Sequence, residues 1–164
     1  MDMEKEKETI NTRKVVNMVK VICGLMGSGK TTYAINNKKE NDVLLDWDML
    51  VEAFKTNNPV WVKEVQDMLL EYFNKKGYDI WYITTKLGSK ELELLKQIKD
   101  VEYIWINTTK QQCLENIKRR NRNDEEQHIE ELKRINEKIY KNYYINSNNI
   151  NYKIIDAFSS NERW

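Results

Sequence analysis

The chain has 164 residues, with 27 Lys and Arg against 26 Asp and Glu, so its formal net charge is +1. This length suits a single domain, and the balanced charge gives no general electrostatic reason to bind nucleic acid. With two cysteines and no apolar run of membrane-spanning length, neither a disulfide scaffold nor a membrane protein is indicated, and we expect a cytoplasmic protein.

Residues 1–17 form a charged opening segment with little apolar periodicity. Such a segment buries too little apolar surface to order itself, so we expect a flexible leader outside the core. One domain is then predicted over residues 18–164. It begins with an apolar run at residues 19–23, which is typical of a buried strand.

Directly after this strand, residues 24–31 read Gly-Leu-Met-Gly-Ser-Gly-Lys-Thr and satisfy the phosphate-binding pattern G-x-x-x-x-G-K-[ST]. Glycines in such a P-loop let successive N–H groups turn toward a phosphate, and the helix that follows adds its positive dipole end. We expect Lys30 to reach the β- and γ-phosphates of ATP and the Thr31 hydroxyl to ligate Mg²⁺. The alternative, a glycine-rich turn with a chance Lys-Thr pair, does not explain the flanking strand and helix. The predicted nucleotide-binding residues are Gly24, Met26, Gly27, Ser28, Gly29, Lys30, Thr31 and Thr32.

Strands and helices alternate over the rest of the chain. Apolar and β-branched runs predict strands at residues 42–46, 78–84, 101–107 and 152–156. Helical spacing of apolar residues predicts helices at 61–73, 89–99, 109–120 and 125–144, with Thr108 or Thr109 as the N-cap of the third. This alternation favours a single-domain α/β fold with a five-stranded parallel sheet and helices on both faces.

The second predicted strand ends in Asp46-Trp47-Asp48. Ligands of open α/β sheets bind beyond the carboxyl ends of the strands, where this acidic pair would emerge. Two carboxylates two residues apart on an extended segment point to opposite sides, so we expect them to differ in role: the inner one would hold Mg²⁺-bound water, and the outer one would accept a proton from an attacking hydroxyl. The alternative is that one or both cap the following helix, which Asp48 is well placed to do.

A P-loop after the first strand and Asp-x-Asp after the second resemble the small P-loop kinases, which include shikimate kinase, the zeta-toxin kinases and the polynucleotide 5′-hydroxyl kinases. The chain is also similar to short phage-encoded proteins labelled AAA-family ATPase, in which a Cys-Leu-x-x-x-x-x-Arg-x-Arg helix follows the fourth strand. Here residues 113–122 read Cys-Leu-Glu-Asn-Ile-Lys-Arg-Arg-Asn-Arg. The resemblance covers most of residues 18–156 and implies the kinase-like strand order 2-3-1-4-5.

The resemblance also implies roles for individual residues. Asp48 would activate the acceptor hydroxyl, and Asp46 would lie near the metal. Arg120 and Arg122 would close over ATP and stabilise the transferring phosphoryl group. A basic cluster at a helix C-terminus suits this role, because guanidinium groups bind phosphate oxygens in pairs and cations favour that dipole end. The alternative is a solvated basic face that only complements the dipole.

The chain departs from these kinases where the acceptor would bind. The zeta-toxin kinases carry Glu-Gly-Thr at the end of the third strand and shikimate kinase carries a glycine-rich segment, whereas residues 83–86 here read Ile-Thr-Thr-Lys. The polynucleotide kinases place an arginine soon after the acidic pair, where this chain has Met49-Leu50-Val51. Nucleotide handling therefore transfers from the resemblance, and the identity of the acceptor does not.

We predict an ATP- and Mg²⁺-dependent phosphotransferase that moves the γ-phosphoryl group to a hydroxyl of a nucleoside, nucleotide or polynucleotide 5′ end. The expected partners are ATP and a hydroxyl-bearing small molecule or nucleic-acid end, with no membrane. The alternative hypothesis is a nucleotide-hydrolysing switch or motor subunit without an acceptor. Against that alternative, the best Walker B-like run, residues 43–46, sits on the second strand, and the chain lacks room for a lid domain.

Overall fold

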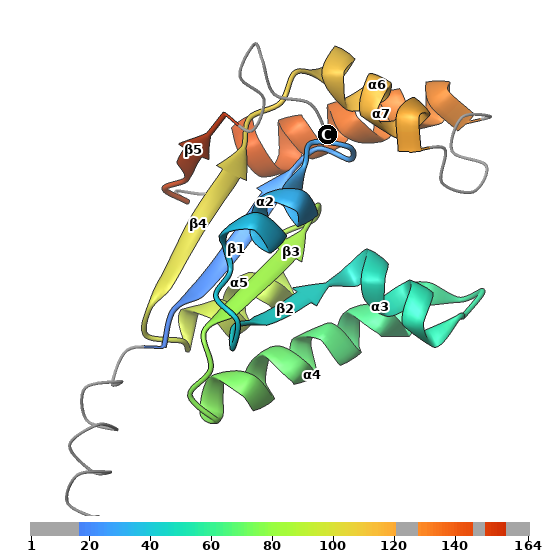
Figure 1. Cartoon of the computed structure of the whole chain (residues 1–164). Helices are drawn as coiled ribbons and strands as arrows, with labels where there is room; N and C mark the ends of the chain where they lie inside the picture. The colour runs from blue at the N-terminus through green and yellow to red at the C-terminus, as the bar shows by residue number, and fades with distance from the viewer. Residues whose placement is uncertain (1–16, 121–127, 146–149, 157–164) are drawn as a thin grey trace, which may run out of the picture.

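Five parallel strands form the centre of the computed structural model, which describes residues 17–120, 128–145 and 150–156 (Figure 1). The strands are β1 (Val19–Gly24), β2 (Val43–Asp46), β3 (Ile80–Thr84), β4 (Val101–Ile106) and β5 (Lys153–Ile155). They lie in the order β2-β3-β1-β4-β5, and every adjacent pair is parallel. The predicted fold class and strand order are therefore confirmed.

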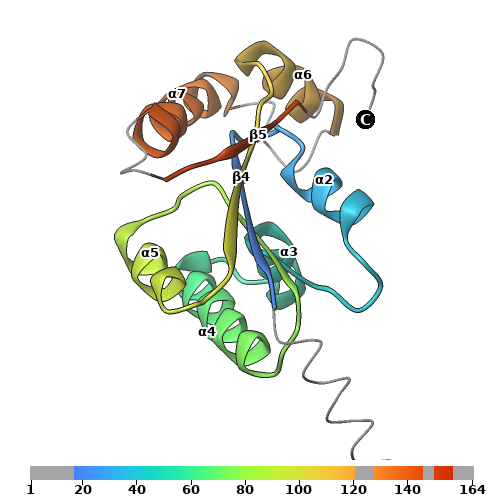
Figure 2. The same ribbon diagram turned by 90° about the vertical axis from the view of Figure 1, so that its left-hand side faces the viewer.

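The described part of the chain forms six α-helices around this sheet. They are α2 (Lys30–Asn37), α3 (Trp47–Phe54), α4 (Val62–Lys75), α5 (Ser89–Lys96), α6 (Lys110–Arg120) and α7 (Ile129–Ile139). Figure 2 shows α2 on one side of the sheet and α4 and α5 on the other, whereas α6 and α7 lie near the carboxyl ends of β1 and β4. These ends of the strands are consequently surrounded by helices from several parts of the chain.

The two faces of the sheet carry separate apolar cores. On the α2 face, Ala34 packs with alternate strand residues such as Ile22 and Ile104. On the opposite face, Leu70 of α4 and Leu95 of α5 pack against the other set of strand residues. Strand β3 is buried along its whole length, which explains why its sequence is apolar and aromatic without alternation.

Several element boundaries differ from the predicted ones. The second strand leads directly into α3, so Asp48 lies in the first turn of a helix. A 3₁₀ turn at Pro59–Trp61 precedes α4, and a π-helical turn at Tyr140–Ile145 follows α7. Residues 125–127 of the predicted long helix and residues 1–16 of the predicted leader lie outside the described residues, so the leader stays a prediction. None of the helices in the described ranges has the length and apolar character needed to cross a membrane.

Trp105 of β4 anchors an aromatic cluster under the π-helical turn. Its side chain is 2% exposed, and its ring lies 4.7 Å from that of Tyr144 and 5.7 Å from that of Tyr152.

Replacing Trp105 by Ala should lower the free energy of unfolding by about 3–5 kcal/mol, because a large cavity would remain. Urea unfolding followed by circular dichroism measures this loss. Trp61→Ala, at a position that is 39% exposed, is the matched control, and an equal loss in both variants would contradict this role of Trp105.

Candidate functional site

The predicted P-loop joins the carboxyl end of β1 to the first turn of α2. Gly29 precedes the helix with a φ of 100°, and Gly27 has a φ of 80°, so both use the left-handed conformation that glycine tolerates. A Cβ at Gly27 would also lie 2.5 Å from the carbonyl oxygen of Cys113. The loop therefore lies close against α6. The positive end of the α2 dipole lies at the end of the loop, where α2 begins.

Lys30 bends back onto the loop that it follows. Its Nζ donates hydrogen bonds to the carbonyl oxygens of Leu25, at 2.7 Å, and of Gly24, at 3.2 Å. Burial lowers the pKa of Lys30 to about 8, and the carboxylate of Asp48 is the largest charge that opposes this shift. The ammonium group therefore lies within the electrostatic reach of Asp48, and an anionic ligand would favour its protonated form.

Asp46 connects the P-loop helix to α3. One carboxylate oxygen accepts a hydrogen bond from the Thr31 hydroxyl, and the other accepts the N–H of Asp48 at 2.9 Å. Asp46, rather than Asp48, therefore caps α3. Asp46 is buried at 4% exposure, whereas Asp48 is exposed one residue into the helix, so the two carboxylates do have different environments.

The oxygen atoms of Thr31 and Asp46 form a donor set that suits Mg²⁺. A hydroxyl and a carboxylate are hard ligands, and Mg²⁺ at phosphate sites takes one or two protein ligands together with phosphate oxygens and water. Within the described ranges, no three His, Cys, Asp or Glu side chains form a metal cage. These residues thus fit a metal held jointly by the protein and a nucleotide.

Of the basic residues predicted to bind phosphate, Arg120 lies at the C-terminal end of α6, the helix that packs against the P-loop. Lys118, Arg119 and Arg120 form the last turn of α6, and Arg120 is the partly buried member of the three. Burial raises the pKa of the Cys113 thiol, and the positive charge of Arg120 opposes this rise. Arg120 therefore lies on the same face of α6 as Cys113, which packs against the loop. Arg122 lies outside the described residues, and its predicted role stays a prediction.

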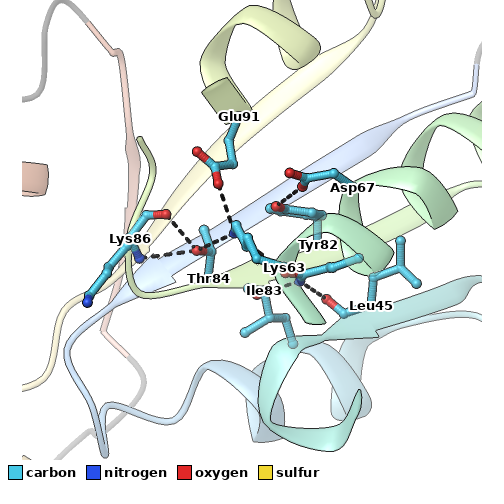
Figure 3. Close-up of polar contacts among 9 residues, drawn as sticks. Leu45, Lys63, Asp67, Tyr82, Ile83, Thr84, Lys86 and Glu91 are labelled. Carbon is cyan, nitrogen blue, oxygen red and sulfur yellow. Dashed lines mark hydrogen bonds and ion pairs between the residues drawn. The ribbon is translucent and has the colours of Figure 1, made fainter. Parts of the chain in front are cut away.

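A second polar cluster surrounds the carboxyl end of β3 (Figure 3). Lys63, in the first turn of α4, donates to the Thr84 hydroxyl at 3.2 Å and forms an ion pair with Glu91 of α5 at 3.6 Å. The Tyr82 hydroxyl donates to Asp67 at 2.7 Å. Gln66 donates to main-chain oxygens of both β2 and β3, each at 3.0 Å, and so ties the ends of these strands together.

Among the residues of this cluster, the sequence indicates only Thr84, which lies within residues 83–86 at the end of the third predicted strand. Lys63, Gln66, Asp67 and Glu91 were missed, because each lies in a helix whose other polar residues face solvent. A signal was present for Gln66, which stands between Val62 and Leu70 on the apolar stripe of α4 at a spacing of four residues. Polar side chains are therefore found at the carboxyl end of β3 and on α4 and α5 as well as at the P-loop.

The fold is similar to those of two solved structures. A crystal structure of an uncharacterized protein from Eubacterium ventriosum matches with a TM-score of 0.57 and 17% identity, over 86% of this chain and 88% of that one. Shikimate kinase from Bacteroides thetaiotaomicron matches with a TM-score of 0.57 and 17% identity, over 90% of each chain. No protein-family model and no curated protein matches the chain. At this identity the likeness establishes the fold alone, and that fold is P-loop kinase-like.

Tyr82 controls the environment of the buried Asp67. Burial raises the pKa of the Asp67 carboxyl, and the hydrogen bond from Tyr82 opposes this rise. Tyr82→Phe should therefore lower the free energy of unfolding by about 1–3 kcal/mol at pH values above the raised pKa, where the ionised Asp67 would lose this donor. The loss should shrink as the pH falls through the raised pKa, because a protonated Asp67 needs the donor less.

Urea unfolding at neutral and at mildly acidic pH measures both effects. Tyr78→Phe, at a position that is 43% exposed, serves as the control and should change the stability very little. A loss for Tyr82→Phe that is the same at both pH values would contradict the proposed coupling to Asp67.

Proposed function

We propose that this protein is an ATP- and Mg²⁺-dependent phosphotransferase that moves the γ-phosphoryl group of ATP to a hydroxyl acceptor. The observation that carries the proposal is the grouping of Lys30, the Thr31–Asp46 pair and the exposed Asp48 at the carboxyl ends of β1 and β2. We further propose that the acceptor is a nucleoside, a nucleotide or a polynucleotide 5′ end. Among small P-loop kinases, we place the chain near the zeta-toxin and polynucleotide-kinase group and the phage-encoded proteins labelled AAA-family ATPase.

In this proposal, Lys30 exchanges its bonds to the loop carbonyls for bonds to the β- and γ-phosphates. The N–H groups of the P-loop and of the first turn of α2 bind the phosphate oxygens, with Thr32 among them. Mg²⁺, held on the side of Thr31 and Asp46, would neutralise part of the phosphate charge. Arg120, and Arg122 with it, would compensate the charge on the transferring phosphoryl group.

Asp48 would act on the acceptor. As the acceptor oxygen forms its bond to the γ-phosphorus, the bond from that phosphorus to the β,γ-bridging oxygen breaks, and Asp48 takes the hydroxyl proton. ADP leaves with the bridging oxygen. The reaction requires mainly positioning and charge neutralisation, since the protein forms no covalent bond to the phosphoryl group.

The arrangement of the sheet favours a kinase over a hydrolytic motor. The two strands beside β1 end in Thr84 and Ile106, so in these described strands no carboxylate follows that could polarise an attacking water. The carboxylates lie instead at the end of β2, beside the start of α3, where they can face a second substrate. A P-loop ATPase without an acceptor remains the competing outcome of the experiment below.

The test is a mass-spectrometric screen for phosphate transfer from ATP to nucleosides, nucleotides, short oligonucleotides and metabolite alcohols. A kinase consumes ATP only when an acceptor is present. With the acceptor so identified, Asp48→Asn should lower single-turnover transfer by roughly 10²–10⁴-fold and leave ATP affinity nearly unchanged, since only the base is lost. Asp46→Asn should instead raise the Mg²⁺ concentration needed for half-maximal rate. Acceptor-independent ATP hydrolysis, or full transfer by Asp48→Asn, would overturn the proposed mechanism.

The pH dependence of ATP binding provides an independent prediction for Lys30. Below about pH 8, the pKa that burial gives this lysine in the free protein, the ammonium is present before ATP binds. Above it, binding must take up a proton, because the phosphates favour the ammonium, so affinity should fall by up to about tenfold per pH unit. Calorimetric titrations over this range measure the slope. Lys30→Arg, which stays charged, should bind ATP with little pH dependence, and the same slope in both proteins would contradict the assignment.

A further inference from the structure

Three successive carbonyl oxygens of the P-loop are each bound by a side chain from outside the loop. Met26 O accepts from Nδ2 of Asn136 on α7, at 3.2 Å, and Gly27 O accepts from Nδ2 of Asn116 on α6, at 2.9 Å. Ser28 O accepts from the Thr108 hydroxyl at 2.7 Å. These donors come from three different segments, which Figure 1 shows near the carboxyl end of β1.

The three donors are buried, and both polar atoms of each asparagine amide have a hydrogen-bond partner. Asn116 is 1% exposed, Asn136 is 2% exposed and Thr108 is 8% exposed. The second amide atom of Asn136 accepts the N–H of Met26 at 2.8 Å, and that of Asn116 accepts from Gln112 at 2.9 Å, which fixes the direction of its amide. Burying an amide is unfavourable unless it is hydrogen-bonded, so an apolar residue would be the ordinary occupant of these helix faces.

Thr108 and its neighbour Thr109 use their hydroxyl groups for different contacts. The hydroxyl of Thr109 accepts the N–H of Gln112 at 3.1 Å and so caps α6. Because Thr109 serves as the cap, the hydroxyl of Thr108 is directed to the P-loop instead.

The geometry of the peptide bond gives these contacts a consequence for the ligand side of the loop. In a planar trans peptide, the carbonyl of one residue and the N–H of the next point in opposite directions. Carbonyls held toward α6, α7 and Thr108 therefore direct the N–H groups of Gly27 and Gly29 to the other side of the loop. The N–H between them, that of Ser28, closes a turn onto Leu25 O at 3.1 Å.

Lys30, and not one of these three donors, binds the first two carbonyl oxygens of the loop. It binds those of Gly24 and Leu25, and in the proposed function it gives up these contacts when phosphate arrives. The contacts of Asn116, Asn136 and Thr108 need not change in that step, because they lie on the opposite side of the loop from the N–H groups.

We propose that Asn116, Asn136 and Thr108 are positioning residues, a carbonyl clamp that keeps P-loop oxygens away from the phosphates and presents N–H groups to them. This inference rests on the proposed nucleotide binding. Without the clamp, peptide flips would bring a carbonyl oxygen against the anionic ligand. Only the unflipped fraction of the protein would then bind ATP, and the apparent affinity would equal the intrinsic affinity multiplied by that fraction.

The experiment measures ATP affinity by calorimetry, with Mg²⁺ present, at a temperature where circular dichroism shows each variant to be folded. Asn116→Ala and Asn136→Ala should each bind ATP about tenfold more weakly or worse. Asn37→Ala is the matched control, because the exposed amide of Asn37 also donates to a main-chain oxygen, that of Tyr33, at 2.7 Å, but on the far end of α2. Its ATP affinity should remain within about twofold of wild type.

A pH profile separates positioning from simple packing. Asn116→Asp keeps the shape of the side chain, and its ionised carboxylate accepts but does not donate, so Gly27 O loses its donor. At lower pH the protonated acid donates again, and ATP affinity relative to wild type should recover. This variant also tests the proposal if the alanine variants do not fold.

The outcomes are distinguishable. Wild-type protein that does not bind ATP would overturn the proposed function and the clamp with it. ATP binding by wild type, with unchanged affinity in folded Asn116 and Asn136 variants, would overturn the clamp alone. A constant affinity ratio between Asn116→Asp and wild type at all pH values would also overturn it.

Discussion

The carboxylate of Asp46 is the contact on which the geometry of the site depends. It accepts the Thr31 hydroxyl from α2 and the N–H of Asp48 from α3, so one side chain sets the helix after β1 and the helix after β2 relative to each other. A carboxylate at a helix N-terminus is stabilised by the helix dipole, and carboxylate oxygens are also ligands that a cation can use. Asp48 is then held one residue into α3, where its charge reaches Lys30. Phosphate-binding, metal-binding and acceptor-facing groups are thus joined through a single residue.

Beside that residue, at the carboxyl end of β3, polar side chains are buried or partly buried. Lys63, Asp67 and Glu91 occupy this region, and burial lowers the pKa of Lys63 and raises that of Asp67. Buried ion pairs contribute little net stability, because desolvation offsets their attraction. These three side chains cluster beside the predicted acceptor side of the P-loop, and groups with shifted pKa values are common at functional sites of proteins.

The likeness to shikimate kinase extends over 90% of the chain, while the end of β3 differs in sequence from the segment expected of that kinase. Here Thr84 binds Lys63 and also exchanges hydrogen bonds with the main chain of Lys86. The end of β3 therefore carries a network of side-chain hydrogen bonds. The sheet and its strand order follow the kinase-like arrangement.

The sequence by itself determined the P-loop, the acidic pair, and the alternation of strands and helices that specifies a parallel sheet. These are contiguous patterns, and local sterics and periodicity suffice to interpret them. Which acid caps α3 was decided only by the folded chain, since both candidates were suitable by type. The donors to the loop carbonyls were equally hidden, because Asn136 and Asn116 lie 110 and 89 residues from their partners. An asparagine on a helix has no local signature of such a contact, and only the packing of α6 and α7 against the loop brings its amide within hydrogen-bonding distance.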